Sequence, residues 1–243
     1  MSNKKKILII QNIHEAGIKL LEDNPNFEFE LIENIDLKFL KEKISNFDGI
    51  SIRTAKLPAE IINHCKKLKI ISRHGVGYDN IDLSYLNERK IALSITGESN
   101  SVSVAEHVMT MILTLSKNIF ASDKLTKNNG FDRKNELPDF FELYQKKILI
   151  LGFGRIGKAL AKRCLGFDME VYVYDPFIEN KNIIAKNCIP IEKEDGFKIA
   201  DYISIHLPLN PKTKNLISDN EFKLFKKNLI LINTARGGII DEK

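Results

Sequence analysis

The stretch KKILILGFGRIGKALAKRCLGFDMEVYVYD, residues 146–175, decides the fold. It opens as an apolar strand pattern, turns at a group of glycines, continues as an amphipathic helix and ends in a second strand. Gly152 permits a tight turn, Gly154 lets a pyrophosphate approach the backbone, and Gly157 lets the helix pack against the strand. An ordinary glycine turn can show the same spacing, so the flanking strand and helix strengthen the prediction of a dinucleotide site.

Asp175 stands at the end of the second strand of this stretch. A carboxylate in that position accepts hydrogen bonds from the adenosine ribose hydroxyls and repels a 2′-phosphate. The sequence therefore favours NAD over NADP as the cofactor.

Strand and helix patterns alternate along the whole chain. In the first hundred residues the strand-like runs are 4–10, 27–33, 49–54, 68–73 and 91–96. This rhythm is typical of parallel sheets with helices on their faces. We predict an α/β fold with two doubly wound parallel-sheet domains: a flavodoxin-like substrate domain over 1–98 and a Rossmann NAD domain over 99–243, the second incomplete.

A long helical pattern from about Ser103 to Ile119 follows the first domain. Ser103 and Glu106 match a capping box at its predicted start, which favours a capping role for Glu106 over a catalytic one. Residues 122–145 lose the periodicity and collect Asn, Lys, Asp, Gly and Pro, so we predict a loop or linker there.

Composition indicates a globular protein of reducing compartments. Of the 243 residues 43% are hydrophobic, and 37 Lys and Arg against 32 Asp and Glu give a net charge of +5. The lysines are interleaved with acids, which favours a solvated surface over a nucleic-acid partner. No apolar run approaches the length of a membrane span. Cys65, Cys164 and Cys188 lie far apart in apolar segments, so we expect no disulfide framework, no metal site and a cytoplasmic location.

Two groups could bind a substrate at the carboxyl ends of strands. Arg236 follows the strand pattern NLILINTA, and two glycines after it leave room for a ligand. Its planar guanidinium suits the carboxylate and carbonyl of a 2-oxo or 2-hydroxy acid, although a surface arginine is the alternative when this residue is read alone. The turn at residues 75–77 could form a concave anion site, or a plain turn.

Five motifs, in order, resemble the D-isomer-specific 2-hydroxyacid dehydrogenases, which include phosphoglycerate dehydrogenase and hydroxypyruvate or glyoxylate reductases. The motifs are SRHGVGYDNID (72–82), NSVSVAEH (100–107), the GFGRIG turn with Asp175, DYISIHLPLNPKT (201–213) and INTARGGIIDE (232–242). The resemblance covers nearly the whole chain. It implies a substrate domain and an NAD domain hinged over a cleft, and usually a homodimer built around the long helix.

The resemblance also implies roles for the matching residues. Arg236 would be the catalytic arginine, and Arg53 could face a substrate phosphate, with capping or salt-bridge use as the alternative. The other substrate-binding positions would be Gly75, Val76, Gly77 and Asn100. The cofactor-binding positions would be Gly152, Gly154, Arg155, Ile156, Gly157, Asp175, His206, Pro208, Thr213, Thr234, Ala235 and Arg236.

In this family a histidine paired with a carboxylate acts as general acid/base, and both come after the arginine motif. Of the five histidines here, His206 matches a cofactor-side position and His74 adjoins the turn at 75–77. We therefore expect an N-terminal fragment of a longer enzyme that has negligible activity by itself. The alternatives are a hydroxypyruvate or glyoxylate reductase and a non-catalytic NAD-binding module of the corepressor type.

Overall fold

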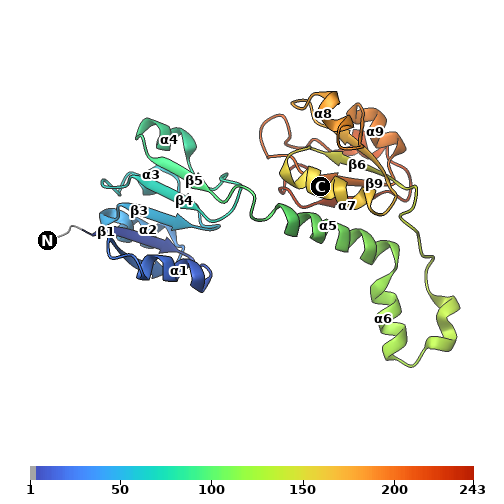
Figure 1. Cartoon of the computed structure of the whole chain (residues 1–243), viewed down its shortest axis with the longest axis horizontal. Coiled ribbons are helices and arrows are strands. Elements are labelled where there is room, and N and C mark those ends of the chain that lie inside the picture. Colours follow the sequence, from blue (N-terminus) through green and yellow to red (C-terminus); the bar gives the residue numbers. More distant parts are fainter. Residues whose placement is uncertain (1–3) are drawn as a thin grey trace. The chain divides into compact units, whose positions relative to one another are not determined.

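The computed structural model describes residues 4–243, which form two compact units (Figure 1). Unit 1 ends at Ser99 and unit 2 begins at Asn100, whereas the sequence placed the boundary after residue 98. Each unit contains one five-stranded sheet in which all neighbouring strands are parallel. The predicted α/β class with two doubly wound parallel sheets is confirmed.

Unit 1 alternates strands and helices. Its strands are β1 (Lys5–Ile10), β2 (Phe27–Ile32), β3 (Gly49–Ile52), β4 (Ile70–Arg73) and β5 (Ala92–Ile95). Its helices are α1 (Glu15–Glu22), α2 (Leu37–Lys43), the short η1 (Ile44–Asn46), α3 (Ala59–Ile62) and α4 (Leu83–Glu88). The strand order β2-β1-β3-β4-β5 reverses direction between β1 and β3, and ligands of such sheets bind at the carboxyl ends of the strands beside that reversal.

The two faces of the unit 1 sheet are covered unequally. Helices α2, α3 and α4 share one hydrophobic core with one face, which includes Leu40 and Leu86. Helix α1 contacts β2, and none of its residues belongs to that core. The strand register aligns Ser51, Ser72 and Ser94 in one row across β3, β4 and β5. Ser72 and Ser94 are exposed, so this face is open over β4 and β5.

Unit 2 begins with helices and then forms the second sheet. Its helices are α5 (Ser101–Ser116), α6 (Ile119–Lys127), η2 (Phe131–Glu136), α7 (Arg155–Leu165), α8 (Asn180–Ile184), α9 (Lys193–Ile199) and α10 (Asp219–Phe222). Its strands are β6 (Lys147–Leu151), β7 (Glu170–Tyr174), β8 (Ile189–Pro190), β9 (Tyr202–Ile205) and β10 (Ile230–Asn233). The order β10-β9-β6-β7-β8 reverses direction between β6 and β9. Residues of α5, α7 and α8 pack in one core, and Phe197 of α9 packs in another.

Part of the predicted linker at 122–145 is helical, which corrects that prediction. The long helix α5 ends at Ser116, and Asn118 adopts a left-handed conformation with φ 45° before α6 begins. Helix α6 buries no residue within the described part of the chain. An ion pair between Asp123 and Lys127 supports it locally, at 2.8 Å.

The capping box expected at Ser103 and Glu106 is also wrong. Helix α5 begins at Ser101, so Ser103 lies inside its first turn rather than at its N-cap. The Glu106 Oε1 instead accepts a hydrogen bond from Arg163 Nη2 at 2.9 Å, which links α5 to α7. Glu106 therefore stabilises the packing of two helices.

Candidate functional site

The three glycines after β6 meet different surroundings. Gly152 has φ 95°, and a Cβ there would lie 2.9 Å from the His206 carbonyl oxygen. A Cβ on Gly157 would overlap the Gly152 carbonyl oxygen. A Cβ on Gly154 would meet nothing within 4 Å. Protein packing therefore requires the first and third glycines, whereas the second faces open space.

Open space at Gly154 coincides with the N-terminus of α7. Gly154 is the N-cap residue, and no side chain there accepts a hydrogen bond from the helix amides. The first amides of a helix attract anions, and glycine lets a phosphate come close to the backbone. This observation shows that the turn fits the pyrophosphate of a dinucleotide, with Arg155 and Ile156 as the first two helical residues.

Asp175 directly follows β7 and holds the glycine turn in place. Its Oδ2 accepts a hydrogen bond from the Phe153 amide at 2.8 Å, and its Oδ1 accepts one from the Phe177 amide at 2.9 Å. A carboxylate oxygen has two lone pairs and can accept more than one hydrogen bond. The carboxylate can therefore order the turn and bind a sugar at the same time.

His206 follows β9, and its backbone amide continues the pairing to β6 through a 2.8 Å bond to the Leu151 carbonyl. The His206 Nε2 lies 2.9 Å from the Ser204 hydroxyl. Burial lowers the pKa of His206 to about 4, so the imidazole is neutral at neutral pH. After it, the Thr213 hydroxyl donates to the Pro208 carbonyl at 2.6 Å and closes the next loop.

The turn that carries Arg236 is held by Asn233, the last residue of β10. The Asn233 side chain donates to the Arg236 carbonyl at 2.8 Å and accepts from the Ala235 amide at 3.0 Å. The Arg236 Nη1 donates to the Ala235 carbonyl at 2.7 Å. Sequence reasoning missed Asn233, although an asparagine that ends a strand commonly closes such a turn.

Most predicted site residues of unit 2 gather at one edge of its sheet. The strands are parallel, so the segments after β6, β7, β9 and β10 all leave the sheet at the edge of the carboxyl ends. Three predicted residues also hold a buried polar atom without a hydrogen-bond partner within residues 4–243: Asn100 Oδ1, His206 Nδ1 and Thr234 Oγ1. Buried groups of this kind are costly, and a bound ligand can supply the missing partners.

In unit 1, Arg53 follows β3 beside the reversal of strand order. Its Nη1 donates to the Asn12 carbonyl at 3.1 Å. Gln11, which follows β1 with φ 70°, accepts from the Thr54 amide at 2.8 Å and ties the two strand ends together. The structure thus places Arg53 at the ligand-binding edge expected for this type of sheet.

The predicted anion turn at 75–77 follows β4, next to Arg53 along the edge. Gly75 has φ 144°, and a Cβ there would overlap Nη1 of Arg73. The Arg73 Nη1 also donates to the His74 carbonyl at 3.0 Å, so its guanidinium packs against the turn. Sequence reasoning did not single out Arg73, although an arginine directly before a glycine turn is a signal for anion binding.

Other kinds of site are not seen in the described part of the chain. No cluster of three or more His, Cys, Asp or Glu there could hold a metal ion. Cys65, Cys164 and Cys188 are free and buried, and burial raises the pKa of the Cys164 thiol to about 12. No helix within residues 4–243 is long and apolar enough to cross a membrane.

Comparison with known sequences identifies relatives over both units. The model for the NAD binding domain of D-isomer specific 2-hydroxyacid dehydrogenases matches residues 109–243. The chain is 37% identical over 243 residues to D-3-phosphoglycerate dehydrogenase of Methanocaldococcus jannaschii, which covers 98% of this chain and 45% of the relative. It is 33% identical over 242 residues to the human D-3-phosphoglycerate dehydrogenase, covering 99% and 45%. The chain thus spans about half the length of these curated relatives.

Solved structures show the same fold. The D-lactate dehydrogenase of Aquifex aeolicus, complexed with NAD and lactic acid, aligns with a TM-score of 0.87 and 29% identity over 97% of this chain and 70% of that chain. The NAD-dependent formate dehydrogenase of Staphylococcus aureus, in complex with NAD, aligns with a TM-score of 0.84 and 28% identity over 97% and 75%. The chain therefore belongs to the D-isomer-specific 2-hydroxyacid dehydrogenase family and contains its NAD-binding domain.

Proposed function

We propose that the protein is an NAD-dependent oxidoreductase that transfers a hydride between nicotinamide and C2 of a small D-2-hydroxy acid. The observation that carries this proposal is the edge of the unit 2 sheet. There the open glycine turn at Gly154 and the carboxylate of Asp175 follow the neighbouring strands β6 and β7, and the turn of Arg236 follows β10 at the same edge. Membership of the family and its similarity to D-3-phosphoglycerate dehydrogenases support the same activity.

The cofactor-binding residues would act in sequence along this edge. The amides of Arg155 and Ile156 would bind the pyrophosphate, and Asp175 would bind the ribose hydroxyls and disfavour NADP. Bound NAD would supply the hydride acceptor. The bound NAD would be bordered by His206, Pro208, Thr213, Thr234 and Ala235. In the described residues, Thr234 Oγ1 and His206 Nδ1 are buried without a hydrogen-bond partner.

Arg236 would bind the substrate carboxylate and polarise the carbonyl on which negative charge develops. Asn233 would hold the Arg236 backbone through the two hydrogen bonds of its side chain. The proton must move to another group, because His206 is neutral with a pKa of about 4 and is therefore poorly matched to acid/base work near neutral pH. His206 would contribute hydrogen bonding to the cofactor.

Unit 1 would also contact the substrate. Its residues Gly75, Val76 and Gly77 would bind the carboxylate together with Arg236. Asn100, at the start of unit 2, would also contact the substrate. Arg53 follows β3 and Arg73 ends the neighbouring strand β4, and two guanidinium groups suit a phosphate better than they suit a neutral group. This pair favours 3-phosphoglycerate over lactate as the substrate.

We also propose a cytoplasmic homodimer formed around α5, α6 and the segment after them. Helix α6 leaves the end of α5 and extends away from the unit 2 sheet (Figure 1). Exposed aromatic residues line this region, with Phe120 78% exposed and Phe140, Phe141 and Tyr144 also exposed. Exposed apolar surface of this kind is typical of protein interfaces. Sedimentation equilibrium should give a dimer, and Phe120→Asp should shift it towards the monomer.

The activity is tested with the full-length protein by following NADH absorbance. D-3-phosphoglycerate should be oxidised with a higher kcat/KM than D-glycerate or D-lactate, and Arg53→Ala should raise KM for the phosphorylated acid only. Arg236→Ala should lower kcat/KM for all three by about 100-fold or more, because the polarising group is lost. Lys38→Gln, an exposed change on α2, serves as the control. Binding of NAD without turnover of any 2-hydroxy acid would instead indicate a corepressor-type module, and preference for glyoxylate would indicate a reductase.

A further inference from the structure

Gln11, the first residue after β1, adopts a backbone conformation that is uncommon for residues other than glycine. Its φ is 70°, in the left-handed region that a Cβ disfavours. Such conformations persist where the surrounding contacts over-determine them, and they cluster at functional sites. Strand β1 lies beside the reversal of strand order in unit 1, so Gln11 stands at the edge where ligands of such a sheet bind.

The Gln11 side chain binds the segment that follows β3. Its Oε1 accepts hydrogen bonds from the Thr54 amide at 2.8 Å and from the Ala55 amide at 2.9 Å. Its Nε2 donates to the Thr54 Oγ1 at 2.9 Å. Backbone amides can only donate, so the atom that faces both of them must be the oxygen of the carboxamide. Gln11 therefore fixes the backbone directly after Arg53.

The next residue, Asn12, binds the side chain of Arg53. The Arg53 Nη1 donates to the Asn12 carbonyl oxygen at 3.1 Å. The Asn12 amide donates to the Glu33 Oε1 at 3.0 Å, which holds Asn12 in place. The turn at Gln11 thus reaches Arg53 in two ways, through the backbone that follows it and through its guanidinium.

Arg53 itself remains exposed to solvent. A guanidinium has five N–H donors, and the bond to Asn12 uses only one of its nitrogens. A long side chain loses rotamer freedom when it binds an anion, and ordering it beforehand lowers that cost. The contacts of Gln11 and Asn12 restrict Arg53 in this way before any ligand binds.

We propose that Gln11 is a positioning residue that prepares Arg53 for an anionic group of the substrate and so favours phosphorylated over unphosphorylated 2-hydroxy acids. This inference rests on the proposed function, in which Arg53 binds the substrate phosphate. A neutral carboxamide suits the position. A glutamate there would also accept from the Thr54 and Ala55 amides, but it would bring a negative charge to the edge where the phosphate binds.

The test measures kcat/KM of the full-length protein for D-3-phosphoglycerate and D-glycerate. Gln11→Gly removes the side chain, and glycine adopts a φ of 70° without strain. The ratio of the two kcat/KM values should fall by about 2- to 13-fold, mainly through KM, which is the usual cost of ordering one long side chain on binding. In an Arg53→Ala background, Gln11→Gly should leave the ratio unaltered, because Gln11 acts through Arg53.

Asn187→Gly is the matched control. Asn187 also has a left-handed φ, of 57°, and is exposed, and it lies between α8 and β8 of unit 2. The same kind of change, from an amide side chain to glycine, should leave the ratio unaltered there. The Asn80 Nδ2 donates to the Ala55 carbonyl at 2.6 Å, so the segment after Arg53 keeps one support and Gln11→Gly should fold. Should it fail to fold, Gln11→Asn, which is one methylene too short for these bonds, carries the same prediction.

Three outcomes overturn the proposal. They are an equal ratio in Gln11→Gly and wild type, an effect of equal size with and without Arg53, and no calorimetric binding of D-3-phosphoglycerate to the wild type. The same comparison of variants is made on this calorimetric affinity, which needs no turnover. Binding that depends on Gln11 and Arg53 without oxidation of any 2-hydroxy acid would therefore contradict the proposed dehydrogenase activity alone.

Discussion

Alanine substitution at two glycines of one turn should separate folding from cofactor binding. Gly157→Ala places a Cβ nearer to the Gly152 carbonyl oxygen than the 3.0 Å that real Cβ contacts keep, and 3.3 Å from the Ile150 Cγ2. Gly154→Ala places a Cβ in open space, with nothing within 4 Å. The same chemical change therefore meets a backbone at one position and solvent at the other.

The clash at Gly157 involves backbone on both sides, since α7 carries the glycine and the turn carries the oxygen. Neither can rotate away as a side chain would, so the helix must move outward from β6. Overpacking of this kind costs about 3 kcal/mol. For a domain the size of unit 2, that cost corresponds to a fall in Tm of about 10 °C.

At Gly154 two small effects oppose each other. Alanine lowers the entropy of the unfolded chain, which stabilises by about 0.4–1 kcal/mol, but it is a poorer N-cap than glycine by a similar amount. The net change in the free energy of unfolding should be below about 1 kcal/mol. The added methyl group would occupy the space proposed for the pyrophosphate, so NAD affinity should fall by about tenfold or more.

Both variants are measured by calorimetric unfolding of the apo chain and by titration with NAD. We expect Gly157→Ala to lower the Tm. We expect Gly154→Ala to lower the affinity for NAD and to leave the Tm nearly unchanged. Equal losses of Tm in the two variants would refute the steric reasoning. Unaltered NAD affinity in Gly154→Ala would refute the placement of the pyrophosphate.

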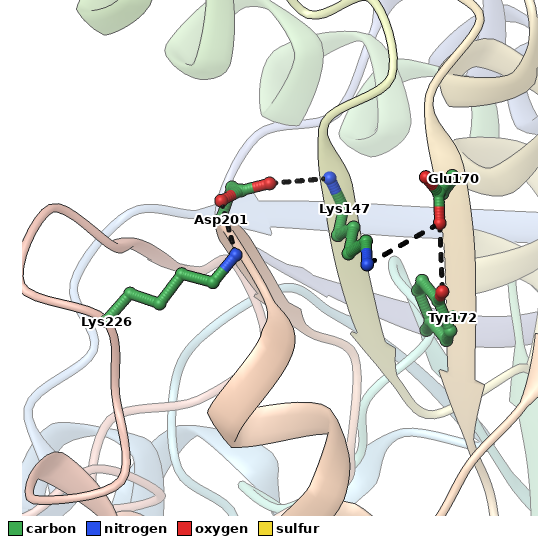
Figure 2. Close-up of polar contacts among 5 residues, drawn as sticks. All are labelled: Lys147, Glu170, Tyr172, Asp201 and Lys226. Atoms are coloured by element: carbon green, nitrogen blue, oxygen red, sulfur yellow. Dashed lines mark hydrogen bonds and ion pairs between the residues drawn. The ribbon is translucent and has the colours of Figure 1, made fainter.

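Four further predictions concern single side chains. Burial would raise the pKa of Asp201, but hydrogen bonds to its carboxylate from the Lys147 amide and from Lys226 (Figure 2) outweigh this and lower it. The charged carboxylate therefore stabilises the fold above the unfolded pKa of about 3.9, and this stabilisation decreases as the pH falls through the lower folded pKa. Asp201→Asn should cost about 1 kcal/mol at pH 7 and less as the pH falls below about 4, and an equal cost in urea unfolding at pH 7 and pH 3 would contradict this. The ring NMR signals of His206 should remain those of a neutral imidazole from pH 8 to pH 5, because burial lowers its pKa to about 4, and a titration near pH 6.5 would disprove it. The chain has no tryptophan and Phe177 is 89% exposed, so Phe177→Trp should add a single fluorophore close to Asp175. The adenine of NAD should stack on this indole and quench its fluorescence, whereas nicotinamide mononucleotide, which has no adenine, should not. Saturation with NAD without quenching would contradict the placement of the adenosine beside Asp175. Asp175→Ala should weaken NAD binding by about 10- to 100-fold and reduce the ratio of the affinity for NAD to the affinity for NADP. An unchanged ratio in competition calorimetry would rule out a contact between Asp175 and the adenosine ribose.

Sequence patterns predicted the parallel sheets because buried strands and glycine turns leave strong local signals. Residues 146–175 contain the strand β6, the helix α7 and the strand β7 in the predicted order. Asp175 follows β7, as its position after EVYVY indicated. These features depend on neighbours along the chain, so one sequence is enough to recognise them.

Features that depend on distant contacts were missed. Helix α6 buries no residue in the described part of the chain, and Glu106 pairs with Arg163, 57 positions away, instead of capping a helix. Asn233 and Arg73 were overlooked because their roles arise from how they contact a turn, which the residue type alone does not reveal. The distinct surroundings of the three glycines likewise require the positions of other segments.

The row formed by Ser51, Ser72 and Ser94 determines how polar the open face of the unit 1 sheet is. Strands buried on both faces usually read as continuous runs of large aliphatic residues. Here Ser72 and Ser94 present hydroxyl groups to solvent on the open face, beside the exposed Ile70. If valine or isoleucine occupied this row, these side chains and Ile70 would form a continuous exposed apolar patch, which would favour self-association. These hydroxyl groups therefore make the exposed face of the sheet polar over β4 and β5 within residues 4–243.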